Sequence, residues 1–164
     1  MQPLPPGAPA TLSDAFGYIT NLMSPTVEDM MVMVLVEAAS KNLYEALAEA
    51  VADDQAKALL CANGREELGH AHRVARAIGK ITGTDYPVPS PDENPYLAVP
   101  LPAYKVDKAM LAGLAETEFN GNNLYDSWAT HCGNAEAAAL FRENGREEIG
   151  HGKRLEQAAA LLPA

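Results

Sequence analysis

The chain carries the octapeptide Asn63-Gly64-Arg65-Glu66-Glu67-Leu68-Gly69-His70, and a second copy, Asn144-Gly145-Arg146-Glu147-Glu148-Ile149-Gly150-His151, lies in its C-terminal half. Around this motif, 17 of the 41 positions from residue 37 to residue 77 are identical to their counterparts at n + 81, without a gap. Identity at a fixed offset indicates an internal duplication. We therefore expect a pseudo-two-fold structure in which equivalent residues meet at the axis.

Each half of the duplication has the pattern of two long helices. We expect helices over about residues 26–52, 53–80, 107–131 and 134–162, because their starts carry helix-capping residues and their interiors lack proline. Residues 81–104 hold six prolines, which exclude a helix or a central strand from this link. The proline-rich start predicts an extended or disordered arm, followed by a short helix within residues 12–23.

This order of elements predicts an all-α protein, an antiparallel four-helix bundle with a long crossover between its second and third helices. The expected domains are an N-terminal arm over residues 1–25 and the bundle over residues 26–162. Within the bundle, we expect repeat halves at 26–80 and 106–162 and the crossover at 81–105.

Composition excludes several classes of protein. Twelve basic and 22 acidic residues give a net charge of -10, which argues against a nucleic-acid partner. The longest apolar run is Met30–Val36, too short to span a membrane. No basic residue precedes Lys41, so we expect no signal or transit peptide and a cytoplasmic protein. Cys61 and Cys132 stand alone, which excludes a rubredoxin module or a thiolate zinc ribbon.

Two motifs inside the repeat carry ligand chemistry. Glu67-x-x-His70 recurs as Glu148-x-x-His151, and a glutamate stands thirty residues before each of these glutamates. Residues three apart share one face of a helix, so each motif points a carboxylate and an imidazole to the same place. The duplication then gathers six candidate metal ligands, namely Glu37, Glu67, His70, Glu118, Glu148 and His151.

Carboxylates and imidazoles without thiolates suit iron, manganese or zinc. One glutamate from each of two helices and Glu-x-x-His from each of the other two is the ligand set of di-iron carboxylate bundles. Four ionised carboxylates repel one another and are costly to bury, whereas two divalent cations cancel their charge. We therefore predict a two-metal centre with two iron ions, manganese and zinc being the alternatives.

On these motifs the chain resembles the ferritin-like superfamily, in the style of rubrerythrins and bacterioferritins, over residues 26–162. The resemblance implies that Glu67 and Glu148 bridge the metals and that Glu37 and Glu118 are terminal ligands.

Tyr44 and Tyr125 follow Glu37 and Glu118 by seven residues. The resemblance implies that each tyrosine hydrogen-bonds to a ligand and supplies or relays an electron, the alternative being core packing. It also implies that Glu66 orients His151 and that Glu147 orients His70. The alternative for these two glutamates is a surface pairing with Arg65 or Arg146.

The resemblance implies a non-haem di-iron redox enzyme acting on peroxide or dioxygen, with rubrerythrin-like peroxide reduction as our first hypothesis. Without a rubredoxin module, the electrons must come from a separate donor protein. Gly121 stands where rubrerythrins carry an extra carboxylate, and its repeat equivalent is Ser40. The alternatives are a ferroxidase, an oxygenase with the proline-rich link as a lid, or a non-enzymatic metal-binding bundle. A homodimer would cover any apolar outer stripe of the helices.

Overall fold

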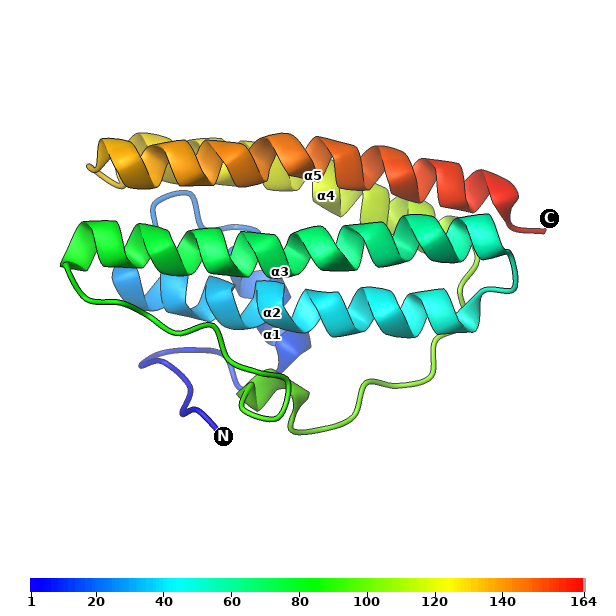
Figure 1. Ribbon diagram of the computed structural model, residues 1–164, viewed down its shortest axis with the longest axis horizontal. Helices are drawn as coiled ribbons and strands as arrows, with labels where there is room; N and C mark the ends of the chain where they lie inside the picture. Colours follow the sequence, from blue (N-terminus) through cyan, green and yellow to red (C-terminus); the bar gives the residue numbers. More distant parts are fainter. Residues whose placement is uncertain (164) are drawn as a thin grey trace.

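The computed structural model describes residues 1–163, whose regular elements are all helical. The four long helices are α2 (Val27–Ala50), α3 (Asp54–Thr82), α4 (Lys108–His131) and α5 (Ala135–Leu161). A short helix, α1 (Leu12–Ile19), precedes them. α2 and α5 run in one direction and α3 and α4 in the other, and the crossover follows the outside of the α2–α3 pair (Figure 1). The predicted all-α bundle is confirmed. Among the described residues, no helix is both long and apolar enough to cross a membrane.

Side chains at the helix starts hold each element in place. At α2 the Thr26 hydroxyl accepts a hydrogen bond from the Asp29 amide, and the Asp29 carboxylate accepts one from the Thr26 amide at 2.8 Å. The other three long helices begin after capping side chains that accept hydrogen bonds from their first free amides: Asp53, Asp107 and Asn134. These bonds satisfy donors that the helix itself leaves unpaired.

We expected the crossover to contain no helix, and this expectation is wrong for one short turn. A 3-10 helix, η1 (Pro95–Leu97), lies in its middle. Proline fits the first position of a helix, because the amide it lacks has no partner there. The side chain of Asn94 caps this turn by accepting from the Tyr96 amide at 3.0 Å and ties it to α2 by donating to the Leu35 carbonyl at 2.8 Å.

The N-terminal arm lies against this crossover. The backbone amide of Gln2 donates to the Glu93 carbonyl at 2.8 Å, and the Tyr96 hydroxyl donates to the Pro9 carbonyl at 3.0 Å. The arm leads into α1, where Tyr18 donates to Asp29 at 2.5 Å. Ala15 and Ile19 of α1 are buried. The helix is therefore fixed to the bundle by both apolar and polar contacts.

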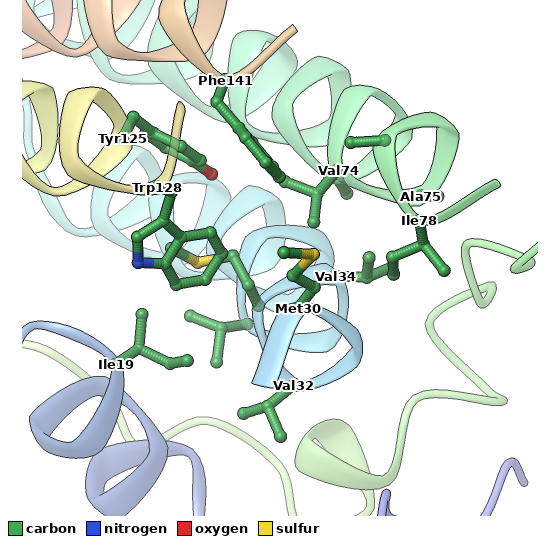
Figure 2. Close-up of a cluster of buried hydrophobic side chains, with 14 of the residues drawn as sticks. Ile19, Met30, Val32, Val34, Val74, Ala75, Ile78, Tyr125, Trp128 and Phe141 are labelled. Atoms are coloured by element: carbon green, nitrogen blue, oxygen red, sulfur yellow. The ribbon is translucent and has the colours of Figure 1, made fainter. Parts of the chain in front are cut away.

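The bundle core is divided into two apolar clusters. Figure 2 shows part of the larger one, where Trp128 and Tyr125 of α4 and Phe141 of α5 meet side chains of α2 and α3. The Trp128 indole donates to the Leu22 carbonyl at 2.6 Å, which satisfies its only polar group. The smaller cluster contains Leu47, Leu60, Leu111 and Leu155. Along α3, the segment from Asn63 to His70 separates the two clusters.

Close contact within each helix pair depends on the first glycine of the repeated octapeptide. A Cβ on Gly64 would lie 3.1 Å from the Lys41 carbonyl and from the Cβ of Tyr44. A Cβ on Gly145 would lie 3.2 Å from the Asn122 carbonyl and 3.3 Å from the Cβ of Tyr125. Side-chain volume at either position would push the helices apart. The octapeptide thereby sets the spacing of α2 to α3 and of α4 to α5.

We predict opposite effects of alanine at two helical glycines. Gly145→Ala overpacks the α4–α5 contact, whereas a Cβ on Gly113 meets nothing within 4 Å. Both substitutions replace a helical glycine with alanine, so both raise the helix propensity equally. The difference between the two variants in free energy of unfolding therefore measures the packing effect alone. We expect Gly145→Ala to be less stable than Gly113→Ala by ~1–3 kcal/mol, measured by urea unfolding. Equal stability of the two variants would contradict the close contact.

We also predict that the Asp29 cap is sensitive to pH. Burial raises the pKa of Asp29, but hydrogen bonds from Tyr18 and Thr26 outweigh it and hold this pKa below its ordinary value. A carboxyl with a depressed folded-state pKa stabilises the fold above its unfolded pKa of about 3.9, and this stabilisation is lost as the pH falls through the folded value. Asp29→Asn should cost ~0.3–1 kcal/mol at pH 7. In urea titrations the difference should shrink below about pH 4, and a constant difference would refute this assignment.

Candidate metal centre

Four buried side chains converge between the two apolar clusters. Glu67 and His70 come from α3, Glu148 and His151 come from α5, and their ligand atoms lie within 4.8 Å of one another. The two imidazole rings stack with centroids 4.9 Å apart. The Nδ1 atom of His70 lies 3.4 Å from Glu67 and 3.2 Å from Glu148. The Nδ1 atom of His151 lies 3.2 Å from Glu67 and 3.4 Å from Glu148.

The remaining two candidate ligands complete a symmetric set. Glu37 of α2 lies 4.0 Å from Nδ1 of His70, and Glu118 of α4 lies 3.6 Å from Nδ1 of His151. Each of these glutamates therefore lies beside one histidine, whereas Glu67 and Glu148 each lie beside both. The structure brings all six sequence-predicted ligands together, one glutamate from each of the four long helices.

Unpaired polar atoms show that this centre fits metal ions. Nδ1 of His70, Nδ1 of His151 and Oε2 of Glu148 are buried and lack a hydrogen-bond partner. Buried polar atoms are nearly always paired, and here both ring nitrogens face carboxylate oxygens. A neutral imidazole that donates from Nε2 presents a lone pair at Nδ1. A lone pair facing carboxylates is repulsive unless a cation lies between them, so the donor set is compatible with a di-metal site.

Protons compete for the same atoms. Burial, followed by the charge of Glu67, raises the pKa of Glu37 and of Glu118 well above its ordinary value. Burial also acts to raise the pKa of Glu67, but the close approach of the His151 and His70 imidazoles outweighs it and lowers this pKa. Burial lowers the pKa of His151, whereas its carboxylate partners raise it, with a net value of about 12. Metal binding at such a site releases protons.

A second set of carboxylates holds the far side of each imidazole. Glu147 lies 3.1 Å from Nε2 of His70, and Glu66 lies 3.1 Å from Nε2 of His151. A carboxylate at Nε2 fixes the proton there and frees Nδ1 for a metal. The two glutamates pair with Arg73 and Arg154, respectively, and the alternative partners Arg65 and Arg146 are exposed.

Sequence reasoning missed the residues that support these carboxylates. Arg73 donates from Nε to Asn144 at 2.5 Å, and Asn144 donates to the His70 carbonyl at 3.3 Å. The other half has the equivalent bonds. Arg154 donates from Nε to Asn63 at 2.6 Å, and Asn63 donates to the His151 carbonyl at 3.3 Å. The signal was present in the sequence, because the arginine and the asparagine are identical in the two halves of the repeat. These contacts join α3 to α5 beside the candidate metal centre.

The two tyrosines connect the halves of the repeat. The Tyr44 hydroxyl donates to Glu118, and the Tyr125 hydroxyl donates to Glu37. Burial, followed by the charge of the partner glutamate, raises the pKa of each hydroxyl well above its ordinary value. Both hydroxyls therefore remain protonated donors at neutral pH. Each tyrosine positions the glutamate that lies on the opposite half.

Comparison with family models gives an identification. The model described as Rubrerythrin matches residues 34–159, which include the whole ligand set. The chain belongs to the rubrerythrin family. Neither curated proteins nor solved structures give a significant match. Membership in the rubrerythrin family agrees with the buried glutamate–histidine centre of this bundle.

We predict that Arg73 supports metal binding without touching the metals. Arg73→Ala removes the cation beside Glu147 and the donor to Asn144, so the orientation of His70 should loosen. Loss of such outer contacts weakens metal affinity by ~10–100-fold, measurable by chelator competition. Arg76→Ala, at an exposed position one turn further along α3, is the matched control and should bind metal like the unchanged chain. Equal affinities in both variants would show that this support is unnecessary.

Proposed function

We propose that this rubrerythrin-family chain is a di-iron oxidoreductase that reduces peroxide with electrons from a separate donor protein. One observation carries the proposal, namely two buried histidines whose unpaired Nδ1 atoms face four glutamates. Two ferrous ions held there would supply one electron each. The family match supports an oxidoreductase, and dioxygen is the alternative oxidant.

The distances support a division of roles among the ligands. Glu67 and Glu148 each lie within 3.4 Å of both Nδ1 atoms, which suits bridging ligands. Glu37 and Glu118 each lie beside one histidine and suit terminal ligands. In this proposal Glu66 and Glu147 hold the Nε2 protons.

Tyr44 and Tyr125 hold the terminal glutamates through their hydroxyl groups, and we propose that they also relay electrons.

We propose that the reaction takes place in the cytoplasm, where a donor protein would dock on the monomer or on a homodimer.

The first experiment is metal analysis of the chain expressed in iron-supplemented cells. We expect about two iron ions per chain. The ferrous protein, reduced without oxygen, is then mixed with hydrogen peroxide or with dioxygen while absorbance follows iron oxidation. Faster oxidation by peroxide supports the proposal. Preference for dioxygen would favour a ferroxidase or oxygenase, and zinc or manganese without a redox response would refute an iron enzyme.

A histidine pair tests the ligand assignment. His151→Ala removes a ligand and should lower iron content and abolish the stabilisation by metal, which amounts to ~2.7 kcal/mol when free metal is one hundred times the Kd. His72→Ala changes an exposed histidine on α3 and should retain both. Melting curves with and without chelator provide the measurement. Full iron content in His151→Ala would exclude this residue as a ligand.

A further inference from the structure

A cavity of ≈ 380 Å³ lies directly beside the glutamates. It exists because α2 packs on α3, α4 packs on α5 and α3 packs on α5, whereas α2 and α4 lie farther apart. All four glutamates of the centre line it and form its floor: Glu37, Glu67, Glu118 and Glu148. Anything bound in this space, which we call the chamber, therefore has direct access to the candidate metal centre.

The duplication builds the walls of the chamber, and α1 adds a part that has no counterpart. Each lining residue from α2 has its repeat equivalent in α4, as Met33 has Leu114 and Leu43 has Leu124. The other contributors outside the floor belong to α1, as Phe16 does, or to its C-cap residue Thr20. The segment just after α1 is tied to α4, because Ser127 donates to the Met23 carbonyl at 2.7 Å.

The chamber is far larger than peroxide or dioxygen requires. One water-sized molecule occupies roughly 30 Å³, whereas sites for organic molecules typically measure ~300–1,000 Å³. Its walls above the floor are mainly apolar side chains, from Met33, Leu43, Leu114, Leu124 and the α1 residues Phe16 and Ile19. Size and lining both suit a small organic molecule.

Charge narrows the class of molecule further. The residues that line the chamber include no lysine, arginine or histidine, so no basic side chain would pair with an anionic group there, and only the metal ions would attract it. Two small residues, Ser40 and Gly121, lie beside the glutamates and do not block access to the floor. The Ser40 hydroxyl already donates to the Val36 carbonyl at 3.0 Å, and a Cβ on Gly121 would lie 3.1 Å from the Glu148 side chain. A neutral molecule can therefore place one end against the floor.

We propose that the chamber binds a neutral, apolar organic hydroperoxide, with its peroxide group at the four glutamates and its hydrocarbon part between Met33, Leu114 and α1. This inference rests on the proposed function and names its substrate class. The O–O bond breaks, two electrons come from two ferrous ions that become ferric, and two protons come from the acid form of the buffer in the solvent. The products are one alcohol and one water molecule.

Binding is tested without turnover, on zinc-loaded protein, with 2-phenyl-2-propanol, the alcohol formed from cumene hydroperoxide. Calorimetry should show one bound molecule per chain. Leu114→Trp fills the chamber and should weaken binding at least tenfold. Leu59→Trp, at a half-buried leucine of α3 outside the chamber, should leave binding unchanged. Absent binding, or equal binding in both variants, would overturn the proposal.

Reactivity is tested on the ferrous protein by stopped flow with cumene hydroperoxide and with hydrogen peroxide. We expect cumene hydroperoxide to oxidise the iron at least tenfold faster, and Leu114→Trp to lower the ratio of the two rate constants at least tenfold. Hydrogen peroxide reduction without this preference and without alcohol binding would overturn the chamber proposal alone. No reaction with either peroxide, together with alcohol binding, would overturn the proposed function and the hydroperoxide, and would leave a neutral organic ligand in place.

Discussion

Four carboxylates and two imidazoles meet in the interior of this bundle, and the rest of the structure accommodates that meeting. Glutamates at such depth repel one another, and water does not screen them. Each imidazole lies between acidic groups and separates them. Its Nδ1 atom faces the buried carboxylates, and its Nε2 atom faces a separate glutamate. Two divalent cations would complete the balance, because they bring positive charge to the atoms that lack hydrogen-bond partners.

Several supports of this centre come from the same repeated octapeptide. Asn63 and Asn144 join α3 to α5, Gly64 and Gly145 let each pair of helices approach, and the glutamates and histidines supply the donors. Apolar clusters on both sides shield this polar layer. The fold and the site therefore depend on the same residues, since the contacts that set the spacing of the helices also orient the ligands.

The two halves are equivalent at the six candidate metal ligands but differ around them. Trp128 and Phe141 enclose Tyr125 in the larger cluster, whereas their repeat equivalents in the first half are Leu47 and Leu60. α1 lies beside the chamber and has no repeat equivalent. The duplication thus accounts for the ligand set, and the departures from it give the chamber one distinct wall.

The sequence by itself determined the helix order and the six candidate ligands, because local capping, helical spacing and the constant offset of the repeat are properties of the chain. It did not reveal which tyrosine reaches which glutamate, the arginines behind Glu66 and Glu147, or the turn at Pro95. Those features depend on contacts between residues far apart in the chain or on exact backbone geometry. The chamber is a further case, since only the tertiary structure shows that α2 and α4 lie apart and that α1 lies beside the space between them.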